Sequence, residues 1–156
     1  MPIVLLDRCG IIHTMISNER IDHLERLLEV VRGLTTAPDL ESFLQTVISE
    51  ASEMTDSELA SILEYDDAAK ELRFLAMQWF DRDLLRPMGV PLEGSAAGWV
   101  YRKGQNLIIQ DTKADQRHFK TVDRVTKHTT HSLAAVPLIV GGEVIGVLAM
   151  FSRESL

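Results

Sequence analysis

The residues best suited to chemistry gather in one polar stretch, residues 111–131. It contains His118, His128 and His131 together with several carboxylates. Imidazoles and carboxylates are ligands that zinc or iron accepts. No two of these histidines are four residues apart, which is a spacing that places a ligand pair on one face of a helix. We therefore predict exposed loop histidines and no metal site. An imidazole lining a pocket would make binding depend on pH near neutrality.

The sequence offers little for catalysis. Its single cysteine, Cys9, excludes an internal disulfide, a cysteine-based metal cluster and paired thiol redox chemistry. The sequence contains no nucleophile elbow, phosphate-binding loop or metalloprotease motif. We predict that the chain is not an enzyme. A small enzyme that uses Asp111, His118 and Asp123 is the weaker alternative.

Aromatic residues and a helix start add candidate binding features. Trp79 and Trp99 could wall a planar ligand, although core packing explains them equally well. Ser95 precedes a short helical segment that Gly104 closes. The free amides at its start suit an anion, but capping by Ser95 is the simpler account.

Length and composition limit the possible classes of protein. The chain has 156 residues, of which 46% are hydrophobic and 25% charged, as in one globular domain with an extension. Its net charge of −7 and the lack of a dense Lys/Arg run argue against nucleic acid as a partner. The sequence contains no apolar run of the roughly 18 residues that a membrane helix needs, and no signal peptide. We expect a cytoplasmic protein with no membrane partner.

Apolar spacing predicts the helices that hold this polar stretch. Residues 1–18 form an N-terminal extension without a clear pattern. Residues 19–34 form an amphipathic helix with a heptad-like stripe; pairing with a second copy and packing on its own domain both explain the stripe. Asp39 caps a second helix over residues 40–54. A short helix near Phe119 follows from apolar residues at three-residue spacing.

Strands are predicted at residues 59–65, 72–79, 90–92 and 107–109, and in a final hairpin. Gly141-Gly142 suits a two-residue turn, because both residues can take positive φ. The strands on either side of this turn are apolar on both faces, so we expect them to be covered on two sides and central in a sheet. Pro137 cannot donate to a ladder, and a local irregularity is expected there.

In this order of elements, four motifs resemble those of the GAF domain family. They are Gly-Ser-Ala-Ala-Gly-Trp-Val at residues 94–100, the strand at 104–111, residues 115–119 and the hairpin at 133–146. The resemblance implies an α+β fold, with a six-stranded antiparallel sheet, helices on one face and a ligand pocket under short helices and loops on the other. On this basis residues 35–156 form the GAF domain.

The resemblance also suggests ligands, since members of the family sense cyclic nucleotides, bilins, haem or other small molecules. Members with covalent bilins and those that reduce free methionine sulfoxide need pocket cysteines, which argues against both here. A cyclic nucleotide is only partly supported, because Ser152-Arg153 stands where those members carry Asn-Lys. Aligning their contact positions with this chain selects Phe80, Asp81, Ala97, Phe119, Asp123, Thr126 and Thr130. Trp79, Asp111 and His118 complete the candidate ligand-binding set.

We therefore predict a non-enzymatic regulatory sensor of signal transduction. A small molecule would bind between the sheet and residues 111–131, and the change would pass through the helix at 19–34. The receiver would be a homodimer partner or an effector domain such as a kinase or cyclase. The main alternative is a dimerisation or interaction module without a ligand.

Overall fold

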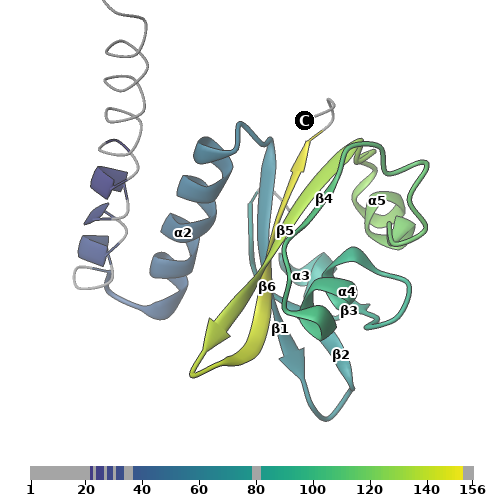
Figure 1. Cartoon of the computed structure of the whole chain (residues 1–156). Helices are drawn as coiled ribbons and strands as arrows, with labels where there is room; N and C mark the ends of the chain where they lie inside the picture. Colours follow the sequence, from purple (N-terminus) through teal and green to yellow (C-terminus); the bar gives the residue numbers. More distant parts are fainter. Residues whose placement is uncertain are drawn as a thin grey trace, which may run out of the picture.

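The computed structural model describes residues 22, 24–26, 28–29, 31–33, 37–78 and 82–152. Six strands in this part of the chain form one antiparallel sheet in the order β3-β2-β1-β6-β5-β4 (Figure 1). The strands are β1 Leu59–Asp66, β2 Glu71–Met77, β3 Gly89–Val90, β4 Leu107–Ile109, β5 Ser132–Val140 and β6 Glu143–Ser152. The predicted α+β fold with a six-stranded sheet is confirmed. The short strand predicted at residues 90–92 lies slightly earlier and ends before Pro91, which has no N–H for the ladder.

The β5–β6 hairpin lies centrally in the sheet, as its apolar strands predict. Gly141 and Gly142 have φ values of 61° and 88°, which is the conformation that a tight hairpin turn needs. The pairing register shifts between Leu138 and Ile139, whereas Pro137, where the irregularity was expected, pairs in register with Val147. The expectation of cover on both faces fails at the tip, where Ile139, Val140 and Ile145 are exposed.

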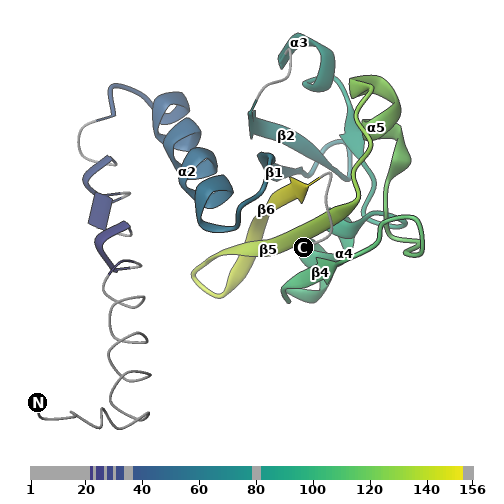
Figure 2. The ribbon, with the colours of Figure 1, turned by 90° about the horizontal axis from the view of Figure 1, so that it is seen from above.

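Helix α2, Leu40–Met54, covers one face of the sheet. Asp39 caps it by accepting a hydrogen bond from the Ser42 amide at 2.7 Å, as the sequence predicts. Its fully buried Ile48 packs on a cluster of sheet residues, Ala60, Ile62, Ala76 and Met150. Figure 2 shows α2 standing beside the sheet, with the other labelled helices on the far side.

The opposite face carries the shorter helices α3 Arg82–Leu85, α4 Ala96–Lys103 and α5 Lys120–Thr126. Ser95 caps α4 by accepting from the Gly98 amide at 2.9 Å, and Gly104 ends it with φ of 61°. A Cβ at Gly98 would lie 2.3 Å from the Leu92 carbonyl oxygen. Only glycine therefore allows α4 to approach the segment before it so closely.

The described residues between 22 and 33 are helical and lie beside α2, on the side away from the sheet (Figures 1 and 2). Leu24, Leu28 and Val31 are 60%, 54% and 55% exposed. The predicted extension at residues 1–18 lies outside the described residues. No helix among the described residues has the length and apolar character needed to cross a membrane.

Candidate functional site

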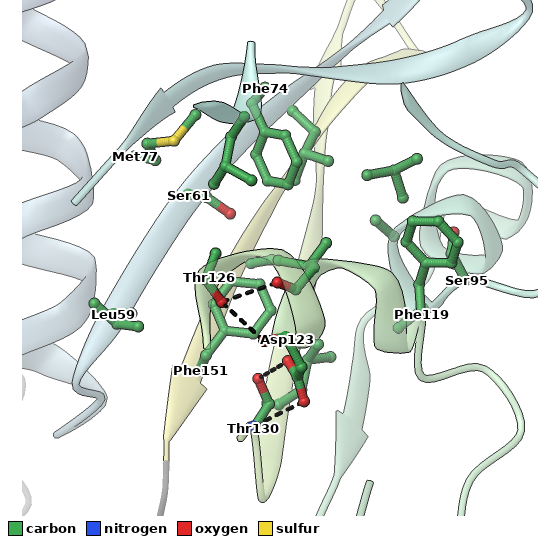
Figure 3. A pocket seen from close by; sticks show the side chains of 18 of the residues that line it. Leu59, Ser61, Phe74, Met77, Ser95, Phe119, Asp123, Thr126, Thr130 and Phe151 are labelled. Carbon is green, nitrogen blue, oxygen red and sulfur yellow. Dashed lines mark hydrogen bonds between the residues drawn. The ribbon is translucent and has the colours of Figure 1, made fainter. Parts of the chain in front are cut away.

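A cavity of about 70 Å³ lies between the sheet and the layer formed by α4 and α5 (Figure 3). Its wall is largely apolar and includes Leu63, Phe74 and Val122. Two aromatic rings, Phe119 before α5 and Phe151 on β6, also line it. Because ligand pockets for drug-sized molecules are roughly 300–1,000 Å³, a larger ligand needs the covering layer to move outward.

Ser61 is the unusual residue in this apolar wall. Residues alternate along β1, so that Ile62 packs toward α2 while Leu59, Ser61 and Leu63 line the cavity. Ser61 is 3% exposed, and its Oγ is the one buried side-chain oxygen or nitrogen without a hydrogen-bond partner among the described residues. A buried hydroxyl without a hydrogen-bond partner lowers the free energy of unfolding by about 1–3 kcal/mol. The hydroxyl points into the cavity (Figure 3), where a bound molecule could satisfy it.

We use the name lid for residues 111–131, the polar stretch between β4 and β5. Thr112 is buried and ties the two ends of the lid together. Its hydroxyl donates to the Thr130 carbonyl at 2.5 Å and its amide to the His131 carbonyl at 2.9 Å. The His131 amide donates in turn to Ser152 at the end of β6. The lid is thus anchored at both ends while α5 covers the cavity between them.

A polar network centred on Asp123 holds the middle of the lid. Asp123 Oδ2 lies 2.9 Å from His118 Nε2 and accepts from the Thr130 amide at 3.0 Å. Its Oδ1 accepts from the Thr130 hydroxyl at 2.8 Å. The His118 side chain is only 8% exposed, and His128 and His131 are half-buried, so the prediction of exposed loop histidines is wrong. Both carboxylate oxygens of Asp123 are engaged, and all three residues of the network line the cavity.

A second contact fastens the lid to α4. Arg117 donates from Nε to Asp115 Oδ1 at 2.9 Å and from Nη2 to Oδ2 at 2.6 Å. The side-chain hydrogen bonds from Arg117 hold the pKa of Asp115 below its usual value. The Arg117 guanidinium carbon also lies 5.2 Å from the centre of the Trp99 ring, in a cation–π contact. Trp99 therefore packs at the base of the lid and does not line the cavity.

The comparison with family models decides the family. The model of the GAF domain matches residues 37–156, which is most of the chain. The chain belongs to the GAF domain family. Members of this family are generally regulatory modules, and the predicted resemblance is confirmed.

Relatives and solved structures agree with this assignment. The GAF domain is 24% identical to a probable 3',5'-cyclic phosphodiesterase of Caenorhabditis elegans over 82% of the chain, but covers only 19% of that protein. The GAF domain of a phosphoenolpyruvate-protein phosphotransferase from Coxiella burnetii has a TM-score of 0.76 and 20% identity, with 85% of this chain and 79% of that chain covered. The free methionine-R-sulfoxide reductase from Neisseria meningitidis has a TM-score of 0.68 and 20% identity, covering 84% and 73%. These structures support the fold.

The chain spans less than a fifth of the length of the curated relatives it matches. The structural neighbours include enzymes, namely two free methionine-R-sulfoxide reductases. Among the described residues of this GAF domain, no group of three His, Cys, Asp or Glu side chains is placed to hold a metal ion.

The structure brings most of the predicted ligand residues together. Six of them line the cavity: Ala97, His118, Phe119, Asp123, Thr126 and Thr130. Asp111 is exposed and does not line it; its carboxylate accepts from the Lys113 amide at 2.9 Å and stabilises the first turn of the lid. Trp79, Phe80 and Asp81 lie outside the described residues.

Ser61 was not predicted, because the strand that carries it reads as a nearly continuous apolar run. The position of Ser61 in the two-residue alternation of the strand could have revealed it. Ser61 shares a strand face with Leu59 and Leu63, and a lone hydroxyl on a buried face needs a partner.

Proposed function

We propose that this GAF domain is a non-enzymatic sensor of signal transduction that binds a small molecule in the cavity under the lid. The observation that carries the proposal is the Ser61 hydroxyl, which has no partner among the described residues and lies inside a largely apolar cavity. Ligand sites typically combine apolar walls with a few well-placed polar groups. A ligand with one hydrogen-bonding group on an apolar body would satisfy Ser61 and fill the space beside it.

The lid supplies a means of signalling. The small volume of the cavity means that most ligands must displace α5 outward, which strains the contacts of Asp123 with His118 and Thr130. A ligand shifts the balance between closed and displaced lid only by its different affinity for the two states. A ligand that fits the displaced state therefore changes the outer surface of the lid, which other parts of the protein can read.

Screening the chain against small molecules tests this proposal. Thermal-shift measurements with metabolites, nucleotides and haem should reveal at least one compound that raises Tm, with a rise that grows with the logarithm of its concentration above Kd. Ala97→Leu places extra volume in the cavity and should abolish the shift, whereas Ala68→Leu, in the exposed β1–β2 turn, should retain it. Ligands that bind equally well to both variants would place the site elsewhere.

Cyclic nucleotides are the second candidate ligand, since the curated relatives include cyclic-nucleotide phosphodiesterases. Phe119, Asp123, Thr126 and Thr130 line the cavity at positions that the family uses for such ligands. Both oxygens of Asp123 are already engaged, so a base would have to displace Thr130 or His118. Cyclic GMP and cyclic AMP belong in the screen for this reason.

We also propose that the chain acts in the cytoplasm as a homodimer that passes its signal to an effector domain. Leu24, Leu28 and Val31 are more than half exposed at the spacing of a helical stripe, and a second copy would cover them. Sedimentation of Leu28→Glu should show a monomer, and Glu29→Gln should remain dimeric. A monomeric native chain would contradict the dimer. A dimer for which no ligand is found would favour the alternative of an interaction module.

A further inference from the structure

A groove of about 450 Å³ opens on the outer surface of the lid. Four cationic side chains line it: Lys113, Lys120, Arg124 and Lys127. Its volume lies within the range typical of ligand pockets, and it is open to solvent. The groove is therefore large enough for a charged group of a small molecule together with its neighbouring atoms.

The four cations of this groove have no carboxylate partner in the part of the chain that the structure describes. None of them forms an ion pair with a carboxylate among the residues that the structure describes, whereas Arg73, Arg102 and Arg117 each do. The single carboxylate among the described residues that line the groove is Asp123, whose oxygens are engaged by His118 and Thr130. The groove is thus positively charged in a chain whose net charge is −7. Such a surface favours an anion.

The groove and the cavity share one wall. Four residues line both hollows: His118, Asp123, His128 and Thr130. These side chains separate an apolar interior from a cationic exterior. A molecule that displaces the contact between His118 and Asp123 would reach both environments at once.

We infer that the ligand of this GAF domain is an amphipathic anion, with an apolar part in the cavity and a phosphate group in the cationic groove. The inference rests on the proposed function and names the class of ligand that the site takes. A doubly charged phosphate suits four unpaired cations better than a neutral polar group does. Such a ligand must separate the side chains of the shared wall, so its binding is coupled to the position of the lid.

Titration calorimetry on the full chain tests the inference with three probes: phenyl phosphate, phenol and inorganic phosphate. Phenyl phosphate should bind at least about tenfold more tightly than either of the other two, because only it contacts both hollows. The double variant Lys120→Gln/Arg124→Gln should lose about tenfold in affinity for phenyl phosphate and keep the affinity for phenol. Both side chains are exposed, so the variant should fold like the native chain.

A matched control removes the same charges outside the groove, in Arg86→Gln/Lys103→Gln, and should leave phenyl phosphate binding unchanged. If the two double variants weaken binding equally, general charge attraction explains it and the inference fails. Phenol that binds as tightly as phenyl phosphate would overturn the anionic class and leave the sensor proposal standing. If inorganic phosphate binds as tightly as phenyl phosphate, the groove binds anions without help from the cavity, and the inference fails. If neither phenyl phosphate nor phenol binds, the inference fails, and the thermal-shift screen alone decides the sensor proposal.

Discussion

Replacing Ser61 with alanine should stabilise the protein, although serine-to-alanine changes at satisfied buried hydroxyls destabilise. The Ser61 hydroxyl is buried and unpartnered in the absence of ligand. Its removal relieves a cost of about 1–3 kcal/mol and leaves a methyl group that suits the apolar wall. We expect the free energy of unfolding to rise by about 1 kcal/mol or more, which raises Tm by roughly 2–4 °C in a chain of this size.

Urea and thermal unfolding of three proteins measure this effect: the native chain, Ser61→Ala and Ser52→Ala. Ser52 is a matched control because its hydroxyl is buried to a similar degree but donates to the Ser57 carbonyl. Ser52→Ala should lose about 1 kcal/mol. The gain in Ser61→Ala should be accompanied by weaker binding of any ligand that depends on the hydroxyl. Equal destabilisation of the two variants would show that Ser61 has a partner and would refute the reasoning.

Three further predictions concern α4 and the lid. Gly98→Ala should lower the free energy of unfolding by about 2 kcal/mol, because its Cβ meets a backbone carbonyl at 2.3 Å, whereas alanine in a helix interior normally stabilises. Asp123→Asn should speed hydrogen exchange at the Thr130 amide about tenfold, since that amide loses a charged acceptor. The pKa of Asp115 is lowered from 3.8 by Arg117, so the stabilisation from this carboxylate is full above pH 3.8 and is lost as the pH falls through the folded pKa. The stability gap between the native chain and Asp115→Asn, measured in urea, should close over that range.

Each of these has an outcome that contradicts it. A more stable Gly98→Ala variant would mean that α4 can shift without cost. Unchanged exchange at Thr130 would show that the Asp123 network does not hold the lid. A gap between the native chain and Asp115→Asn that widens on acidification would reverse the sign of the linkage at Asp115.

The elements with local signals could be predicted from the sequence. The cap at Asp39, the α4 cap at Ser95 and the Gly141-Gly142 turn each depend on a few neighbouring residues, and each is found as predicted. The exposed tip of the hairpin was not predicted, because an apolar strand does not indicate where the layers that cover it end. Ile139 and Val140 at the tip are exposed.

The site needed tertiary information. Asp111 and His118 look alike in sequence as polar residues of one stretch, yet the fold exposes the first and buries the second against Asp123. The cationic groove was hidden because its members are spread over residues 113–127 and the chain is acidic overall. Folding of the lid gathers them on one surface, which neither net charge nor a search for basic runs reveals.

A crystal structure of the chain purified from cells without added ligand tests the central claim most directly. The account predicts electron density for a small molecule in the cavity, with a polar atom in hydrogen-bonding distance of Ser61 Oγ. Density for water alone, with Phe119 and Phe151 closed over Ser61, would contradict it.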